Sequence, residues 1–340
     1  MKQNKENTTK ISRKKFLKIC GSVIAGGSIL GISSLLLRNK FNIKGEIYTN
    51  KENLVKSGIT SPYKLVSSFS IPNNIEGFES YNNKLIIAAS NNIYVYDEYG
   101  SLINNFGIGS NIRDISVKNN MVYILFSTRI EIYNLEGEWQ NDWEACSDMS
   151  DYCSFAVTDN FIFVTDAANK NICKYTTEGD FVKFIQSPNK FIVPSHSFGI
   201  TYIDGTIYCS NPGRHQIESY TINGDYIGTF GKAGGAAGMF CGCCNPVYIT
   251  KTSTGELITS EKGNPRISCY SQDGDFRSIL LDDKMLGGGN TAYKVKVQDD
   301  ILFIAGKNMV STFKYDNALV IKTACSTCNV KCPLREGISI

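Results

Sequence analysis

The stretch IESYTINGDY, residues 217–226, determines the fold predicted for this chain. Its first part contains the β-branched and aromatic residues Ile217, Tyr220 and Ile222, which favour a strand. Asn223 and Gly224 come next, a pair that favours the tight turn of a β-hairpin because both residue types tolerate positive φ. The segment therefore predicts a strand, a turn and a second strand.

The same strand and turn recur along the chain. In each copy a strand rich in β-branched and aromatic residues leads to a polar residue and then to glycine. The turn glycines are Gly100, Gly137, Gly179, Gly224 and Gly274, and Asn317 takes the sixth place. Successive copies are 37 to 50 residues apart, a length that suits four short strands each.

Six units of this size predict an all-β fold, a six-bladed β-propeller, over residues 61–324. Further short apolar strands lie upstream of the turns, such as residues 85–88 and 161–164, and no helical periodicity interrupts them. Radial closure of small sheets leaves few open strand edges, which favours this arrangement. A further strand, residues 64–71, is expected to pair with the last blade and close the ring.

Two copies carry a more specific pattern. They read DAANKNI (166–172) with EGDF (178–181), and SNPGRHQI (210–217) with NGDY (223–226). Both resemble NHL repeats, and the resemblance continues in weaker form over residues 75–320. It implies a six-bladed propeller in which a glycine-rich run, then Gly-x-Phe, then proline connects the outer strand of one blade to the inner strand of the next. NHL-like propellers include a metal-dependent lyase and several esterases or lactonases.

The N-terminal segment predicts a membrane anchor. SRKKFLK (12–18) resembles the twin-arginine export signal, with lysine in place of the second arginine, and an apolar run rich in glycine and serine covers residues 19–37. The run is just long enough to cross a bilayer as a helix. We therefore expect an uncleaved signal or transmembrane helix in residues 1–40, a linker in 41–60, and a body on the extracytoplasmic side of the cell membrane.

The charge and the cysteine content argue against some classes of function and favour others. Residues 1–50 carry ten Lys or Arg against two Glu, a net charge of +8, so the remaining 290 residues carry a net charge of −5. An acidic body argues against nucleic acid as a partner. Two histidines are too few for a His-rich metal centre, whereas twelve cysteines require either an oxidising compartment or a thiolate metal site.

Three cysteines interrupt one connection between blades. CGCCNP (241–246) follows a glycine-rich run and Phe240, in the place where the NHL resemblance puts the entry to blade five. This position implies that the adjacent pair Cys243 and Cys244 lies at the mouth of the central channel. Adjacent cysteines rarely bond to each other because the resulting ring is strained, so each thiol is expected to face a separate partner.

A second cluster, CSTCNVKCP (325–333), lies in a C-terminal tail, residues 325–340, that we expect to pack on the propeller. It resembles the cysteine spacing of bacterial ferredoxins, but with three cysteines in place of four, so a fourth ligand must come from elsewhere. The predicted ligands of an iron–sulfur cluster or zinc are Cys243, Cys244, Cys325, Cys328 and Cys332, and Cys241, Cys146, Cys153 and His196 are further candidates on the same face.

Disulfides are the competing interpretation of the same residues. In that case Cys146 pairs with Cys153, in the connection into blade three, and the tail is stapled to the blade-five connection. The other cysteines are expected to be structural. Cys173, Cys209 and Cys269 fall within strands as small buried residues, and Cys20 falls in the apolar run as a membrane-buried thiol.

Other polar residues are assigned ordinary roles. His215 falls in the repeat's own His-bearing turn, and Asp114, Asp159 and Asp204 are interpreted as turn residues, not as calcium ligands. His196 is a candidate ligand or proton carrier at the channel mouth. No nucleophile elbow, phosphate loop or paired-carboxylate signature is present in the sequence.

Three functions are compatible with these patterns. The leading one is a non-catalytic, membrane-anchored extracytoplasmic propeller that docks a protein partner or transfers electrons, with a thiolate centre at its channel mouth. The second is a disulfide-stapled interaction module without a cofactor. The third is a lyase or hydrolase, which would need His, Asp or Glu at the channel, and the sequence does not visibly supply them.

Overall fold

The computed structural model describes residues 61–109 and 112–316, and this part of the chain is all β. It contains twenty-four strands and two short 3₁₀ turns. The strands form six four-stranded antiparallel sheets. The predicted all-β, six-bladed propeller is therefore confirmed.

Five blades take their four strands consecutively from the chain. Blade one contains β2 (Gly77–Tyr81), β3 (Lys84–Ala89), β4 (Asn92–Asp97) and β5 (Leu102–Gly107). Blade two contains β6 (Ile112–Lys118), β7 (Met121–Phe126), β8 (Arg129–Asn134) and β9 (Trp139–Glu144). Blade three contains β10 (Tyr152–Val157), β11 (Phe161–Asp166), β12 (Asn171–Thr176) and β13 (Phe181–Ile185). Blade four contains β14 (Ile200–Ile203), β15 (Thr206–Asn211), β16 (Gln216–Thr221) and β17 (Tyr226–Phe230). Blade five contains β18 (Tyr248–Lys251), β19 (Leu257–Glu261), β20 (Arg266–Tyr270) and β21 (Phe276–Leu281).

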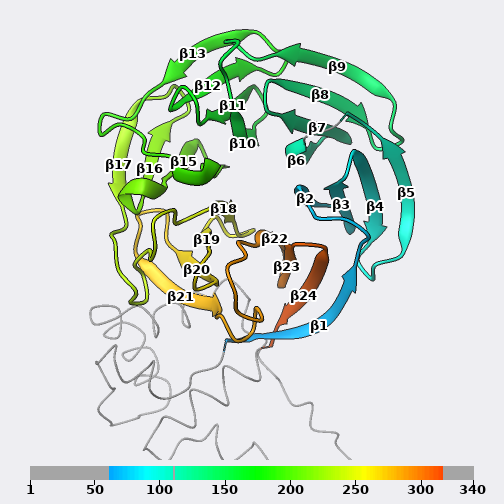
Figure 1. Ribbon diagram of the computed structural model, residues 1–340, viewed down its shortest axis with the longest axis vertical. Helices are drawn as coiled ribbons and strands as arrows, with labels where there is room; N and C mark the ends of the chain where they lie inside the picture. Colours follow the sequence, from blue (N-terminus) through cyan, green and yellow to red (C-terminus); the bar gives the residue numbers. More distant parts are fainter. Residues whose placement is uncertain (1–60, 110–111, 317–340) are drawn as a thin grey trace, which may run out of the picture. The chain divides into compact units, whose positions relative to one another are not determined.

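The sixth blade joins the two ends of the described chain. It consists of β22 (Lys294–Gln298), β23 (Ile301–Gly306), β24 (Met309–Tyr315) and, as its outer strand, β1 (Tyr63–Ser70). In β1 and β24, Tyr63 pairs with Tyr315 and Ser70 with Met309. The expected closing strand is thus confirmed, and β1 lies on the rim beside β24 (Figure 1).

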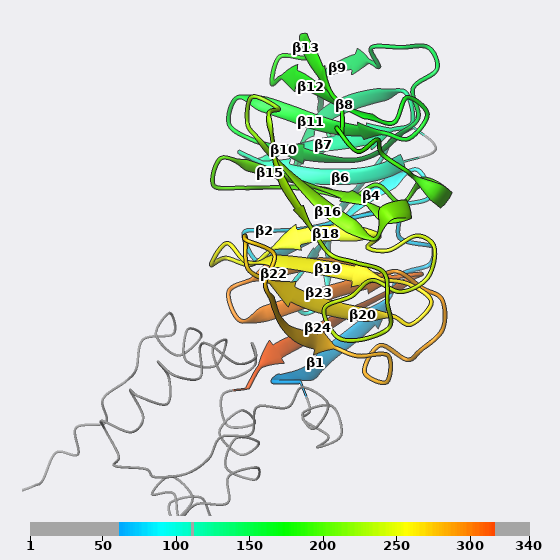
Figure 2. The same ribbon diagram turned by 90° about the vertical axis from the view of Figure 1, so that its left-hand side faces the viewer.

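The blades are arranged around a central axis. The first strand of each sheet lies towards the centre and the fourth towards the rim, as Figure 1 shows, while Figure 2 shows the ring from its side. Neighbouring blades share apolar contacts: Ile86 and Ile93 of blade one pack with Ile112 and Ile124 of blade two, and all four are buried. Burial on both sides explains why the middle strands are continuous apolar runs instead of alternating ones.

The repeat glycines close the hairpins between the third and fourth strands. Gly137 has φ +92°, and a Cβ at this position would lie 2.5 Å from the Phe106 ring of the preceding blade. The other four predicted turn glycines also have positive φ, between +86° and +100°. Glycine is required here both because L-residues rarely adopt this φ and because a side chain of the neighbouring blade covers the turn, an aromatic ring in four cases and Ile185 at Gly224. The sixth marker, Asn317, lies outside the described residues.

The predicted anchor (1–40), linker (41–60) and cysteine tail (325–340) also lie outside the described residues, as does Cys20. In the described part of the chain, no helix has the length and apolar character needed to span a bilayer.

Candidate functional site

The site is built on three connections that lead from the rim of one blade to the centre of the next. They are residues 145–151, 186–199 and 231–247, which enter blades three, four and five. We call the surface that they form the connection face. As the repeat phase predicted, Cys146, His196, Cys241, Cys243 and Cys244 all lie on these connections, whereas Cys153 is the second residue of inner strand β10.

The blade-five connection is fixed from below by a buried ion pair. Arg266 of β20 donates to Glu261 of β19 through Nε at 2.6 Å and through Nη2 at 2.9 Å, and the two side chains are 6% and 0% exposed. The guanidinium also donates to the Gly235, Ala236 and Met239 carbonyls of the connection, and Glu261 accepts from the Cys241 backbone N–H at 3.4 Å. The N–H groups of the guanidinium are thus fully used in charge-assisted hydrogen bonds, which hold the loop that carries Cys241, Cys243 and Cys244, the cysteine loop, against blade five.

Asn245 pins the other end of the loop. Its side-chain amide donates to the carbonyls of Cys241 at 2.6 Å and Lys262 at 2.9 Å, and its oxygen accepts from the Lys262 N–H at 2.9 Å. Gly242 lies between these contacts with φ +72°, a conformation that favours glycine. The order CGCCN therefore has a local explanation: glycine makes the turn and asparagine closes it.

Cys243 and Cys244 form a thiol pair with unequal exposure. Their Sγ atoms lie 2.9 Å apart; Cys243 is exposed, whereas Cys244 is 2% exposed. Burial acts to raise the pKa of Cys244, but hydrogen bonds with Cys243 and Ser195 and the nearby Lys262 charge outweigh it and leave that pKa below its ordinary value. The hydrogen bond to Cys244 raises the pKa of Cys243. The pair can thus hold one proton between two sulfurs.

A polar chain links this pair to blades two, three and four. The Cys244 Sγ lies 3.7 Å from the Ser195 Oγ, and the next residue, His196, places its Nδ1 2.7 Å from an Asp151 carboxylate oxygen. The other Asp151 oxygen accepts from Arg113 at 3.2 Å. Ser195 and His196 have φ of +57° and +54°, a conformation that is uncommon for non-glycine residues and concentrates at functional sites.

The structure pairs Cys146 differently from the sequence prediction. The disulfide alternative joined Cys146 to Cys153, whereas the Cys146 Sγ lies 3.4 Å from the Cys173 Sγ, and the Cys153 thiol donates to the Asp151 carbonyl at 3.6 Å. Burial and the Asp151 charge raise the pKa of Cys153 to about 12. The sequence prediction placed both cysteines in the connection into blade three, whereas Cys153 lies in inner strand β10.

No disulfide and no group of three or more metal-binding side chains is present among the described residues. Cys325, Cys328 and Cys332 lie outside them, so the predicted convergence of the tail on Cys243 and Cys244 stays a prediction. The expectation of buried positions for Cys173, Cys209 and Cys269 is confirmed, with exposures of 0%, 0% and 5%. His215 lies in the expected turn, with φ +58°.

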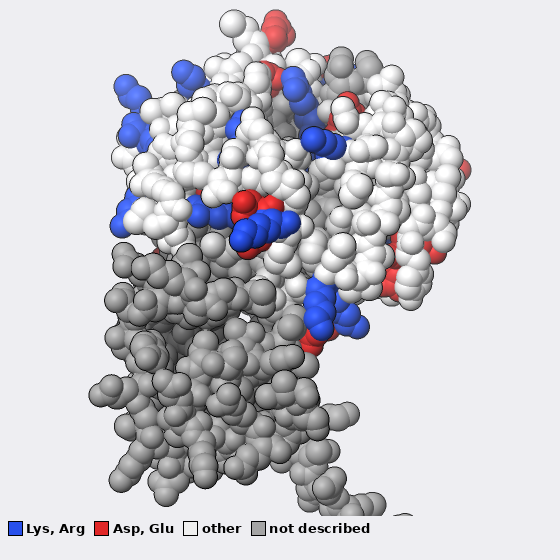
Figure 3. Space-filling model, turned by 60° about the horizontal axis from the view of Figure 1, so that its bottom comes forward, with Lys and Arg blue, Asp and Glu red and all other residues white. Residues whose placement is uncertain are grey.

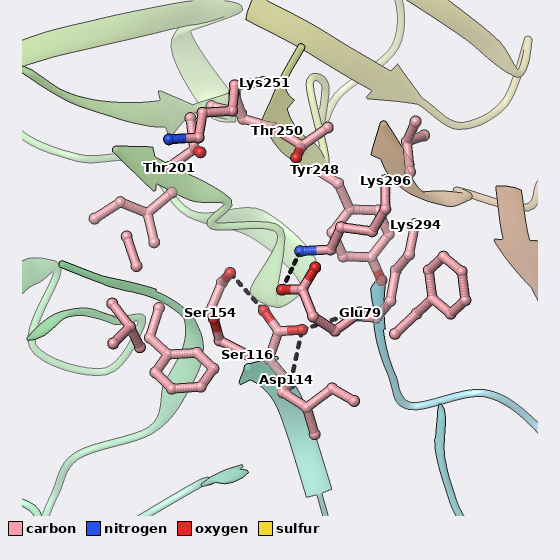
Figure 4. A pocket seen from close by; sticks show the side chains of 18 of the residues that line it. Glu79, Asp114, Ser116, Ser154, Thr201, Tyr248, Thr250, Lys251, Lys294 and Lys296 are labelled. Carbon is pink, nitrogen blue, oxygen red and sulfur yellow. Dashed lines mark hydrogen bonds and ion pairs between the residues drawn. The ribbon is translucent and has the colours of Figure 1, made fainter. Parts of the chain in front are cut away.

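The central channel holds charged residues that the sequence reading missed. Its cavity, of about 230 Å³, is lined by the six inner strands. Lys294 of β22 binds Asp114 of β6 at 3.0 Å, and Lys296 binds Glu79 of β2 at 2.9 Å, as Figure 4 shows. The prediction that Asp114 serves a turn is wrong, because it lies within β6 and also accepts from the Ser154 hydroxyl at 2.8 Å.

The residues that line the cavity carry charges of both signs as well as hydroxyl groups. Burial acts to lower the pKa of Lys294, but the Asp114 carboxylate outweighs it and raises that pKa, and the Lys294 ammonium also lies 4.6 Å from the Tyr248 ring centre. Lys251 and Thr201 lie across the cavity from Asp114 (Figure 4). Elsewhere, on the face drawn in Figure 3, the charged side chains of the described residues stand singly or in small groups. The channel is a concave place in which acidic, basic and hydroxyl groups converge.

A simple signal would have found these residues. Glu79, Asp114, Lys294 and Lys296 are charged residues inside short inner strands, and inner strands line a propeller channel. The chain therefore supplies Asp and Glu at the channel, contrary to the expectation that weakened the enzyme alternative.

Comparison with known proteins extends the description of the fold. No protein-family model matches the chain. A catalytically inactive variant of virginiamycin B lyase from Staphylococcus aureus, solved with quinupristin, is 14% identical; the match covers 74% of this chain and 99% of the lyase, with a TM-score of 0.53. A streptogramin B lyase is 14% identical over 75% of this chain and 98% of that chain, with a TM-score of 0.52. A protein of unknown function from Bacteroides thetaiotaomicron is 11% identical over 74% of this chain and 72% of that one, with a TM-score of 0.53. At these identities the likeness concerns the fold alone.

Proposed function

We propose that this chain is an NHL-type propeller, anchored in the cell membrane through residues 1–40, whose body serves outside the cytoplasm as a docking or electron-transfer accessory of a protein partner. Its centre is a thiolate-ligated metal, an iron–sulfur cluster or zinc, on the connection face. The observation that carries the proposal is the 2.9 Å contact between the Cys243 and Cys244 sulfurs, on a loop held by a buried ion pair.

The local chemistry suits thiolate ligation. Metals take the thiolate form of cysteine, and the lowered pKa of Cys244 favours that form at neutral pH. Cys243 is exposed, so the pair is open to a ligand from solvent or from the tail. Two sulfurs are too few for a structural zinc or a cluster, and Cys325, Cys328 and Cys332 are the donors that we assign to complete the set.

The test is metal analysis of the full-length chain, purified anaerobically in mild detergent. We expect either iron with acid-labile sulfide and an absorption band of an iron–sulfur cluster, or stoichiometric zinc. The double variant Cys243→Ser/Cys244→Ser and the triple variant Cys325→Ser/Cys328→Ser/Cys332→Ser should each lose the metal. Cys269→Ala, in the same blade but buried in its core, is the matched control and should retain it.

Two results would count against the metal centre. Metal-free protein in which two or four of these five cysteines resist alkylation would indicate the disulfide-stapled alternative. Metal retained in both the double and the triple variants would place the centre elsewhere. The anchor is tested separately: the full-length chain should stay in membranes after a carbonate wash, whereas a chain beginning near residue 50 should be released.

The channel supports a second candidate function, a lyase or hydrolase acting on a small molecule. The observation in its favour is the cavity of about 230 Å³ in which the Lys294–Asp114 and Lys296–Glu79 pairs meet. Concave sites with a few convergent polar groups are the usual places for ligands. Because the fold is similar to that of a lyase solved with quinupristin, quinupristin is the first compound to test.

The assay is mass spectrometry of quinupristin after incubation with the purified protein. Cleavage that is lost in Asp114→Asn and kept in Asp159→Asn, a turn aspartate outside the cavity lining, would support this candidate. Unchanged quinupristin, together with no shift of the melting temperature on adding it, would reject this substrate for the channel.

A further inference from the structure

A second pair of cysteines joins the connection into blade three to a strand of that blade. Cys146, in the connection 145–151, and Cys173, in β12, are 27 residues apart in sequence, yet their Sγ atoms are 3.4 Å apart. A disulfide requires about 2.05 Å between the sulfurs, so an approach of little more than 1 Å separates the thiols from a bond. Both cysteines are free in the structure.

The position of Cys146 is fixed by two tyrosines of the same blade. Its backbone N–H donates to the hydroxyl oxygens of Tyr175 at 3.0 Å and Tyr152 at 3.4 Å, and these two hydroxyls also hydrogen-bond to each other. The Tyr152 hydroxyl lies 3.9 Å from the Cys146 sulfur. Both tyrosines are almost fully buried, so this frame holds the Cys146 sulfur beside Cys173.

We propose that Cys146 and Cys173 form a redox-active thiol pair that closes to a disulfide when the chain meets a disulfide oxidant, such as glutathione disulfide. The inference concerns blade three and is independent of the metal centre assigned to Cys243 and Cys244. The bond would join the connection into blade three to the third strand of that blade.

The unequal exposure of the two thiols sets the order of the reaction. Cys146 is partly exposed and Cys173 is fully buried, so the oxidant meets Cys146 first. The Cys146 thiolate attacks one sulfur of the oxidant, which releases one glutathione thiolate and leaves a mixed disulfide. The Cys173 thiolate then attacks the Cys146 sulfur, and the second glutathione thiolate leaves. Two electrons and two protons pass to the oxidant, which ends as two thiols.

Burial also predicts that the second step is slow. Burial, together with the neighbouring Cys146, raises the pKa of Cys173, so little thiolate is present at neutral pH. The Tyr152 hydroxyl partly offsets this by donating to the sulfur. The pair should therefore oxidise completely only over long incubation or at alkaline pH.

The test uses the full-length chain, purified in detergent with a reductant and then incubated with glutathione disulfide. Free thiols are blocked with N-ethylmaleimide in denaturant, and tryptic peptides are identified by mass spectrometry. The expected product is residues 130–170, which contain Cys146 and Cys153, joined to residues 171–174, which contain Cys173. The product should persist in Cys153→Ala and disappear in Cys146→Ser. Oxidation should raise the melting temperature by about 5 to 10 °C, and a phosphine reductant should reverse the rise.

Two outcomes would overturn the proposal. One is alkylation of both Cys146 and Cys173 after prolonged oxidation of the wild-type chain at pH 8.5. The other is a link from Cys173 to residues 130–170 that is lost in Cys153→Ala, because this would show that Cys153 is the partner.

Discussion

Arg266 and Glu261 face each other across a hairpin of blade five and meet through two parallel hydrogen bonds, at 2.6 and 2.9 Å, with almost no solvent access. The same guanidinium reaches three carbonyls of the glycine-rich connection. The rigidity of the cysteine loop therefore depends on a pair that lies beneath it.

Breaking this pair should destabilise the propeller and loosen the loop. Glu261→Gln or Arg266→Met should cost about 3 to 5 kcal/mol of unfolding free energy, because each leaves a buried group without its partner. The matched control is Arg129–Glu131, which has the same atoms at 2.6 Å but 31% and 13% exposed side chains. Glu131→Gln should cost about 1 kcal/mol or less. Chemical denaturation measures both, and equal losses would contradict the account.

The Cys243–Cys244 pair should begin to react at a lower pH than an ordinary cysteine. Because the pKa of Cys244 is lowered, the pair loses its first proton below the ordinary cysteine range, and the labelling rate should reach its plateau at lower pH. The Cys153 pKa of about 12 predicts that this thiol is still unreactive at pH 9. The rate of iodoacetamide labelling of each peptide, measured from pH 6 to 10, tests the order. A Cys153 that labels first would reverse it.

The channel pair Lys294–Asp114 should stabilise the ring across blades. Lys294→Met leaves a mostly buried carboxylate unpaired, so we expect a loss of about 3 kcal/mol. Lys251→Met, an exposed lysine on the same cavity, should change stability by less than about 0.5 kcal/mol. Thermal unfolding of the two variants gives the comparison, and a neutral Lys294→Met would mean that water already satisfies Asp114.

Gly137 and Gly205, which lies in the hairpin between β14 and β15, should differ in their tolerance of alanine although their φ angles agree. Gly137→Ala introduces a Cβ 2.5 Å from the Phe106 ring at φ +92°, whereas Gly205→Ala, at φ +93°, meets nothing within 4 Å. Gly205→Ala should cost about 1 kcal/mol, the strain of positive φ alone, and Gly137→Ala should cost at least 1 kcal/mol more. Equal costs in urea denaturation would show that the neighbouring ring moves aside freely.

The fold was predictable because its signals are local and repeated. A β-branched strand, a polar residue and a glycine at φ near +90° are properties of a single hairpin, and five such copies together with the Asn317 copy indicate the blade count. The closing strand β1 was also predictable. It is an additional strand before the first blade, and in a closed ring the open edge of the last blade is the place left for it. These inferences need no knowledge of which side chains meet in space.

The site was predictable only to the level of the connection. Repeat phase placed Cys146, His196 and Cys243 on the loops between blades, but not their partners. The contact of Cys146 with Cys173 depends on how the connection folds back over β12. Lys294 and Asp114 are 180 residues apart and come from blades that are not neighbours in the ring, so no local pattern shows that they pair with each other.

The pairing of β1 with β24 also determines when the ring of blades can close during folding. β1 is the first strand of the propeller to leave the ribosome and β24 is the last, so blades one to five can complete themselves while β1 still waits without a partner. Until β24 has been made, β1 has no strand to pair with and its edge is open. An open strand edge is a template for pairing with another chain. A chain that crosses a membrane unfolded, N-terminus first, would bring β1 across at the start and β24 at the end. A chain that crosses already folded would have closed its ring beforehand.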